Sequence, residues 1–370
     1  MRFDSLVDRV KQIALQTGAG EKLPNVYEMR DEMGVSITTL TSALSELEAR
    51  RLIIRRPGIG IFASPNIGKR VISLVCDPTF FRTGGGSPFW DMLINHARTR
   101  AESHNELLEL HFSSIVGDAL ELPAALTADI AAGRVQGVLY VGTFKEGVQW
   151  IESHGVPVVV FAGWGSHMVG LDEHAIIRSG VENLTSRGCR RIALARPDNR
   201  VIVAEDVAQF NDYGLEVFRT ALKCDHVSYY ADLIRPVTTA VCPGPWMPAV
   251  SSQEAGYRTA LEWFALPADR RPDGVVVTDD LMTLGILGAT QEAGIAVGRD
   301  FHVATHANAG SAMLIGWEEK IVSLKVDPAK VASVMFEMLE RLMDGDRDVP
   351  TNVYLPPAAV SGTKIVIELS

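Results

Sequence analysis

The chain has 370 residues, which is too many for one ordinary hydrophobic core and predicts about two or three compact units. Its hydrophobic content of 47% and charged content of 22% are the profile of a soluble globular protein. The apolar runs fall far short of the roughly 20 residues that a membrane-spanning helix needs, and the N-terminus lacks the apolar stretch of a secretory signal. We therefore expect a cytoplasmic protein with no membrane contact.

The net charge of −10 argues against nucleic-acid binding by the whole chain, but the charge is unevenly distributed. Residues 1–70 hold 11 Lys and Arg against 8 Asp and Glu, a net charge of +3. The other 300 residues hold 24 against 37, a net charge of −13. This asymmetry favours a mildly basic module that contacts nucleic acid, attached to a body that does not.

The cysteines indicate neither a metal site nor a disulfide framework. Cys76, Cys189, Cys224 and Cys242 form no C-x-x-C pair and match no zinc-ligand spacing. We expect buried, reduced thiols, with no metal and no cofactor.

Residues 1–63 predict three helices followed by a β-hairpin. Apolar side chains recur at helical spacing in the first and third of these segments, and Gly18 ends the first. In chain order the segments are helices over about 2–17, 26–33 and 37–50 and strands over 52–56 and 59–63.

Capping and turn residues support these boundaries. Asn25 is placed to cap the second helix, Gly34 to end it and Ser36 to cap the third, while Pro57-Gly58 turns between the strands. The order is that of a winged helix-turn-helix. Such a unit presents its third helix to the major groove and its hairpin tip to phosphates or the minor groove.

Several motifs in this region fall at a common spacing. They are Gly20-x-x-Leu23-Pro24, Met33-Gly34-Val35-Ser36, Ala43-Leu44-x-x-Leu47 and Pro57-Gly58-x-Gly60-x-Phe62. Over this stretch the sequence resembles the GntR-family winged helix, which implies a DNA-binding module. The family usually has arginines at the positions of Tyr27, Ile37 and Thr41. Because arginine is a frequent reader of guanine and a phosphate clamp, we expect weaker binding that tolerates A·T pairs and depends on dimerisation.

The resemblance and the exposed polar positions together give the candidate DNA contacts. They are Asn25, Tyr27, Ser36, Ile37, Thr38, Thr39, Thr41, Arg55, Arg56 and Gly58. Arg50 and Arg51 are either further phosphate contacts or ordinary solvated charges at a helix end.

Residues 64–70 are short, polar and interrupted by Pro65 and Gly68, so they predict a linker. After the linker, strand-like and helical segments alternate. Strands are expected over about 71–75, 106–112, 137–141, 156–161, 191–195, 274–278 and 301–305, and helices over about 89–101, 119–132, 148–154, 176–187, 215–222, 253–264 and 281–293. This alternation predicts an α/β domain of two lobes, each a doubly wound parallel sheet.

Motifs throughout residues 71–370 carry a second resemblance. They include Ser87-Pro88-Phe89-Trp90, Gly155-Val156-Pro157-Val158-Val159, Val169-Gly170-x-Asp172, Gly188-Cys189-Arg190-Arg191-Ile192-Ala193, Pro272-Asp273-Gly274-Val275-x-x-x-Asp279-Asp280 and Val326-Asp327-Pro328. This part resembles the LacI/GalR effector domain, related in fold to periplasmic binding proteins. The two resemblances together are those of the arabinose-repressor group of regulators.

That fold implies three crossings between the lobes, which we expect near Trp164, Glu318 and Gly345. The near lobe would then span about 71–163 and 319–344, and the far lobe about 164–318 and 345–370. Sheets of this kind bind ligands at the carboxyl ends of their strands, so the cleft between the lobes is the expected effector site.

Aromatic faces and carboxylates at strand ends suit a sugar-like effector. The candidate effector contacts are Phe89, Trp90, Trp164, Asp172, Trp246, Asp280 and His306. Other interpretations stay open: Phe89 as core, Asp280 as a helix cap, Trp164 and Trp246 as interface residues, and His306 as the end of a strand.

Two departures from the LacI pattern suggest that the effector is not an ordinary sugar. An arginine that the family uses on ligand hydroxyls is Gly214 here, and Arg196, Arg200 or Asn211 are possible substitutes. The family's Gly-aromatic-Asp becomes the sequence His306-Ala307-Asn308.

We therefore expect a dimeric, ligand-responsive transcription regulator that represses from a DNA operator. The alternative is a ligand sensor whose winged helix no longer binds DNA specifically. No catalytic triad or phosphate-loop motif is present, which argues against an enzyme.

Overall fold

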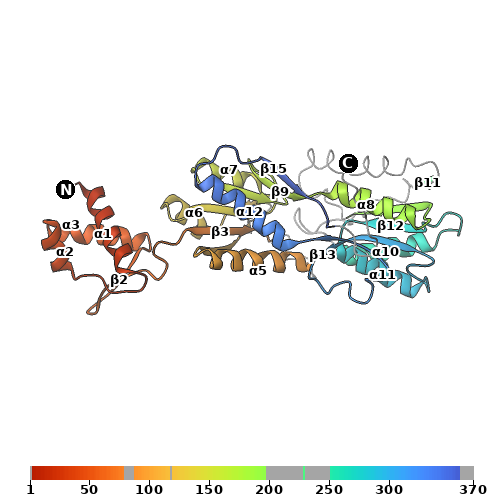
Figure 1. Ribbon diagram of the computed structural model, residues 1–370, viewed down its shortest axis with the longest axis horizontal. Helices are drawn as coiled ribbons and strands as arrows, with labels where there is room; N and C mark the ends of the chain where they lie inside the picture. Colours follow the sequence, from red (N-terminus) through yellow and green to blue (C-terminus); the bar gives the residue numbers. More distant parts are fainter. Residues whose placement is uncertain (1, 79–86, 117–118, 197–227, 230–250, 359–370) are drawn as a thin grey trace, which may run out of the picture.

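The computed structural model describes residues 2–78, 87–116, 119–196, 228–229 and 251–358. Figure 1 shows three parts in a row: a small helical head, a near lobe beside it, and a far lobe at the opposite end. We use "head" for residues 2–68, "near lobe" for the sheet that contains β3 and its helices, and "far lobe" for the sheet that contains β10 and its helices.

The head has the predicted order of three helices and a hairpin. Its elements are α1 (Phe3–Thr17), α2 (Val26–Met33), α3 (Ile37–Ala49), β1 (Ile53–Arg56) and β2 (Gly60–Ala63). β1 and β2 pair antiparallel, with Ile54 opposite Phe62. The apolar stripes of the three helices meet in one core, which includes Leu6, Met29, Leu40 and Leu47.

The caps expected from the sequence are present. Asn25 Oδ1 accepts from the main-chain N–H groups of Tyr27 and Glu28 at 2.9 and 3.0 Å, and the Glu28 carboxylate accepts from Asn25 N at 2.9 Å. This reciprocal capping box fixes the start of α2. Ser36 caps α3 through Thr39 N at 3.1 Å, and Gly34 ends α2 with a φ of 65°.

The structure differs from the expected linker over residues 64–70. Ser64 and Ile67 are buried, and Ile67 belongs to the core of the head. Ser64 N donates to Leu52 O at 2.9 Å. Polar composition predicts a flexible link, but these contacts fold the segment onto the head. Only Lys69 and Arg70 separate the head from β3.

The near lobe is a six-stranded sheet in the order β15-β9-β8-β7-β3-β4. The strands are β3 (Val71–Cys76), β4 (Leu107–Phe112), β7 (Gly137–Val141), β8 (Val158–Phe161), β9 (Met168–Leu171) and β15 (Asn352–Leu355), and all their pairings are parallel. β5 (Ser114–Val116) and β6 (Ala119–Glu121) form a small separate hairpin.

Helices cover both faces of this sheet. α5 (Pro88–Ser103) and α12 (Pro328–Met343) share one apolar core with it, and α6 (Ala124–Ala131) and α7 (Lys145–Ser153) share the other. The helix expected over 119–132 starts later, at Ala124. Pro123 sets this start because proline suits the beginning of a helix but not its interior.

The far lobe is a five-stranded parallel sheet in the order β11-β10-β12-β13-β14. Its strands are β10 (Arg191–Ala195), β11 (Ser228–Tyr229), β12 (Gly274–Val277), β13 (His302–Asn308) and β14 (Val322–Val326), and its helices are α8 (Glu173–Ser186), α10 (Ser252–Phe264) and α11 (Asp280–Glu292). The helix expected over 215–222 lies outside the described residues.

The strand pairings place the lobe crossings further along the chain than the expected positions near Trp164, Glu318 and Gly345. β9 and β15 pair with each other in the near-lobe sheet, whereas β14 belongs to the far lobe. The chain therefore crosses near Asp172, near Asp327 and just after Leu355. The sequence alone does not indicate these positions, because the residue pattern of an edge strand is the same whichever sheet the strand joins.

Two further observations concern the described residues. Cys76 and Cys189 are buried free thiols, as expected, and burial raises the pKa of each to about 12. Cys224 and Cys242 lie outside the described residues. Within the described part of the chain, no helix is both long and apolar enough to cross a bilayer.

Candidate nucleic-acid interface and effector site

The exposed side of α3 forms a shallow groove of hydroxyl and apolar groups. The residues that line it are Ile37, Thr38, Thr41, Ser42, Ser45 and Glu46. Ser42 and Ser45 donate their hydroxyl hydrogens to the carbonyl oxygens of Thr38 and Thr41, at 3.1 and 2.9 Å. A hydroxyl oxygen that donates in this way keeps lone pairs with which it can accept.

Tyr27 stands beside this face on α2, with 63% of its surface exposed. The Arg30 guanidinium lies 5.6 Å from the centre of the Tyr27 ring, a cation–π contact that orients the ring. Asn25, Ser36 and Thr39 are engaged in the caps described above, so they position the helices as well as lying near the face.

The two predicted wing arginines have different surroundings. Arg55 is tied to α3: its Nε donates to Glu48 Oε2 at 2.7 Å, and its Nη2 donates to Ser45 Oγ at 3.2 Å. The guanidinium of Arg56 lies over the Phe62 ring at 4.8 Å. Gly58 has a φ of 71°, which allows the tight turn at the tip.

The structure adds a cation that the sequence analysis missed. Lys22 forms a β-bridge with Phe62, and its side chain crosses the wing at Gly60 so closely that a Cβ there would overlap it. Its only sequence signal is its position just before Leu23-Pro24.

At the junction of the lobes, three polar side chains meet. Ser87 is the N-cap of α5 in the near lobe, Asp280 is the first residue of α11, and Asn308 ends β13. Asn308 Nδ2 donates to Asp280 Oδ2 at 2.6 Å and to Ser87 Oγ at 3.1 Å, and Ser87 Oγ donates to Asp280 Oδ2 at 3.3 Å. We call these three residues the interlobe cluster.

The cluster is buried at the junction of the lobes. Asp280 and Asn308 expose only 2% and 4% of their surfaces. Among the described residues, neither Asn308 Oδ1 nor His306 Nε2 has a hydrogen-bond partner of good geometry, and both atoms are buried. Buried polar atoms of this kind are costly unless something satisfies them. A ligand hydroxyl between the lobes would do so.

The pKa of His306, a buried neighbour of Asp280, is lowered. Burial lowers its pKa, and the nearby carboxylates of Asp280 and Glu173 oppose that effect only in part. Arg196, one of the suggested substitutes, lies at the end of β10 with Nη1 4.0 Å from Glu173 Oε1.

The predicted effector residues are not all brought together. Asp280 does not cap α11; that role belongs to Asp279, whose Oδ1 accepts from Met282 N at 2.7 Å. Phe89 is buried in the near-lobe core, stacked on Phe161 with ring centres 5.3 Å apart, and Trp90 packs edge-on against Phe89.

The remaining candidates lie elsewhere. Asp172 caps α8 by accepting from Ala175 N at 2.8 Å, and Trp164 is exposed after β8. Trp246, Arg200, Asn211 and Gly214 lie outside the described residues. Ser87 and Asn308 were absent from the predicted site, although both stand within the quoted motifs. Only the fold brings them to Asp280.

Two separate stretches of the chain match known protein families. Residues 4–63 match the family described as bacterial regulatory proteins, gntR family, and residues 181–363 match a periplasmic binding protein-like domain. A comparison with curated proteins found no match.

Solved structures of similar fold include several regulators. A LacI-family regulatory protein from Chloroflexus aggregans is 20% identical, with 78% of this chain and 96% of that chain covered and a TM-score of 0.58. The regulator CcpA of Lactococcus lactis is 17% identical, with 80% and 100% covered and a TM-score of 0.56. The regulator CelR in complex with cellobiose is 19% identical, with 87% and 89% covered and a TM-score of 0.55.

The fold and these matches define the class: a winged-helix head joined to a two-lobed periplasmic-binding-protein-like domain. More particularly, the head matches the model of bacterial regulatory proteins, gntR family, and the body has the fold seen in a LacI-family regulatory protein.

Proposed function

We propose that the protein is a repressor that binds an operator through its head and releases it in response to a sugar-like effector bound between its lobes. The observation that carries this proposal is the interlobe cluster, in which Ser87 of the near lobe meets Asp280 and Asn308 of the far lobe. A ligand at this point contacts both lobes and can therefore change their relative position.

The chemistry of the cluster favours a neutral molecule that carries several hydroxyl groups. The Asp280 carboxylate accepts hydrogen bonds, the Asn308 amide both donates and accepts, and the uncharged imidazole of His306 offers one of each. The cellobiose complex of a protein with a similar fold supports this choice of effector class.

Repression from an operator with two half-sites follows if the protein is a homodimer in the cytoplasm. A lac repressor dimer bound to operator is among the similar structures, at 16% identity and a TM-score of 0.53. In a two-fold dimer the two heads read a pseudo-palindrome, and effector binding acts by altering their separation.

The second candidate function is a ligand sensor without specific DNA binding. Two features favour it: Tyr27, Ile37 and Thr41 replace the arginines that the family resemblance leads one to expect, and the charge of Arg55 is paired with Glu48. Both features weaken the general attraction to DNA.

Fluorescence-anisotropy titration separates the two functions. The purified protein is titrated against labelled DNA from upstream of its own gene, with random DNA as competitor, at low and moderate salt. Selective binding that a sugar from a panel reverses supports the repressor. Binding no tighter than to random DNA, by folded protein across the whole panel, supports the sensor.

A further inference from the structure

The C-terminal end of α3, the recognition helix of the proposed function, contacts the near lobe of its own chain. Arg134, which lies just before β7, donates from Nη1 to the carbonyl oxygen of Ala49 at 3.0 Å. Ala49 is the last residue of α3, where carbonyl groups have no partner within the helix. A cation at this end also complements the helix dipole.

An ion-pair cluster surrounds this hydrogen bond. Arg51 Nη1 lies 3.4 Å from Glu109 Oε1 of β4 and 3.4 Å from Asp129 Oδ2 of α6. The Asp129 side chain is only 5% exposed, and Arg134 Nε also donates to it at 2.8 Å. One buried carboxylate thus binds a cation from the lobe and a cation from the head.

The backbone of Arg51 is shaped for this contact. Arg51 has a φ of 58°, in the left-handed region that side chains other than glycine and asparagine rarely adopt. The chain turns here between α3 and β1, and the turn directs the guanidinium to the lobe.

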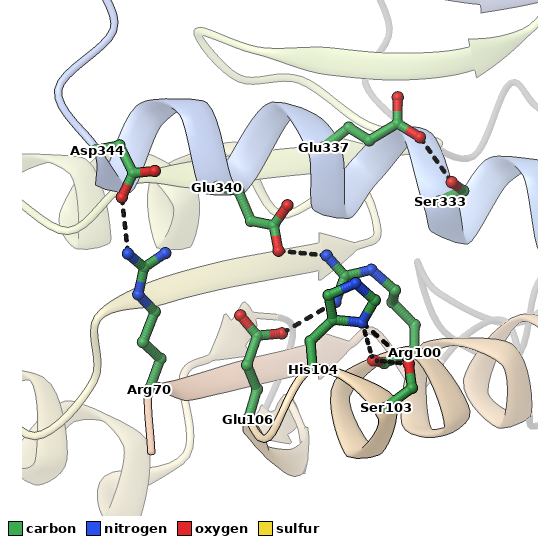
Figure 2. A network of polar contacts seen from close by, with 9 residues as sticks. All are labelled: Arg70, Arg100, Ser103, His104, Glu106, Ser333, Glu337, Glu340 and Asp344. Carbon is green, nitrogen blue, oxygen red and sulfur yellow. Dashed lines mark hydrogen bonds and ion pairs between the residues drawn. The ribbon is translucent and has the colours of Figure 1, made fainter. Parts of the chain in front are cut away.

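A second anchor holds the short connection between head and lobe. Arg70 Nη2 donates to Asp344 Oδ1 at 2.7 Å, at the C-terminal end of α12. Figure 2 shows this pair beside the network in which Arg100 contacts both Glu106 and Glu340. α12 begins at the lobe crossing near Asp327, so it links the crossing to the base of the head.

We infer that Arg51, Glu109, Asp129 and Arg134 form an interface that docks the head on the near lobe in one orientation, so that the lobe sets the direction of the recognition helix. The connection is two residues long. The interface uses Ala49 and Arg51, whereas the groove of α3 is lined by residues between Ile37 and Glu46. The residues that line the groove and the residues that form the interface are different, so docking leaves the groove open.

Limited proteolysis with trypsin tests the docking without DNA. Trypsin cuts after Lys69 or Arg70 when the connection is exposed, and mass spectrometry identifies the released head. We expect Arg51→Asn and Arg134→Gln to release it about fivefold faster than wild type, since partly exposed ion pairs contribute modestly. Asparagine tolerates the left-handed backbone at position 51, and Asp129 keeps Arg134 as its partner in that variant.

Arg98→Gln is the matched control, because Arg98 pairs with Glu102 within α5 and does not touch the head. It should leave the rate at the wild-type value, and circular dichroism should show all three variants folded. Equal rates for Arg51→Asn and wild type, or immediate release of the wild-type head, would overturn the inference.

The consequence for DNA rests on the proposed function. A series of operators whose half-sites differ in spacing tests this. The wild-type protein should bind one spacing most tightly, whereas the affinities of the two docking variants for neighbouring spacings should differ by no more than about threefold. A wild-type protein that binds none of them contradicts the proposed function, while the proteolysis result still decides the docking. Variants that keep the wild-type preference contradict the inference.

Discussion

Glu48 of the recognition helix and Arg55 of the wing form a two-point contact. Glu48 Oε2 accepts from Arg55 Nε at 2.7 Å, and Glu48 Oε1 accepts from Arg55 N at 3.1 Å. The hydrogen bonds from Arg55 lower the pKa of Glu48. The pair joins α3 to β1, and it also neutralises a cation of the head.

Glu48→Gln should therefore strengthen general DNA binding. Loss of the carboxylate frees Arg55 and removes a negative charge near the phosphates, so affinity for random DNA should rise about threefold, with a steeper salt dependence. Anisotropy titrations at several salt concentrations measure this. Glu102→Gln, an exposed helical glutamate paired with Arg98, is the control. A Glu48→Gln protein with unchanged affinity and salt slope would show that Arg55 does not reach DNA.

Thr41→Ala should weaken selective DNA binding without affecting folding. The side chain lines the groove of α3, so its loss should reduce the preference for the operator over random DNA about fivefold or more. The matched control is Thr127→Ala, because Thr127 is likewise an exposed helical threonine, on α6. Should both variants keep the wild-type ratio of affinities, the groove is not the reading surface.

Asp280→Asn should impair the response to effector. Asp280 accepts hydrogen bonds across the lobe junction, and exchanging a buried acceptor for an amide leaves groups mispaired. The sugar concentration that half-releases DNA should rise at least about tenfold. Glu319→Gln, an exposed carboxyl of the far lobe, should leave it unchanged. An unaltered sugar response in Asp280→Asn would place the effector elsewhere.

His306 should make the far lobe less stable in mild acid. Burial lowers its pKa in the folded protein, whereas in the unfolded chain it titrates near about 6.5. Below that pH the unfolded chain binds a proton that the folded chain does not, so the stability present above about 6.5 is lost as pH falls towards 5.

Urea unfolding at pH 7 and pH 5 measures this effect. Between pH 7 and pH 5, the free energy of unfolding of His306→Gln should fall by about 1 kcal/mol less than that of the wild-type protein. His104→Gln, at an exposed helix end, should behave as wild type. If His306→Gln and wild type lose the same amount, folding does not change the pKa of His306.

Gly285 should be intolerant of any side chain. A Cβ there would overlap the carbonyl oxygen of Gln253, because α10 and α11 pack backbone against backbone at this point. Gly285→Ala should lower the free energy of unfolding by about 3 kcal/mol. At Gly288, one turn further along α11, the nearest atom to an added Cβ is Tyr257 Cδ2 at 3.7 Å. Gly288→Ala should therefore raise stability by about 0.5 to 1 kcal/mol, and thermal unfolding compares the two.

Local features of the sequence determined the elements and the class of fold. Asn25, Gly34 and Ser36 mark helix ends through hydrogen bonds to residues at most a few positions away, and the apolar periodicity needs only neighbouring residues. The motifs at fixed spacing then indicated the two kinds of module. These signals lie within single segments, so they can be read without the tertiary structure.

Contacts between distant segments were decided only by the tertiary structure. Ser87 is separated from Asn308 by 221 positions and Arg134 from Ala49 by 85, so nothing local to either member indicates the other. The same holds for β9 and β15, whose pairing moved all three lobe crossings. The free energy of these contacts comes from packing and burial that exist only once the lobes have formed, and for that reason the site and the docking of the head could not be read from the sequence.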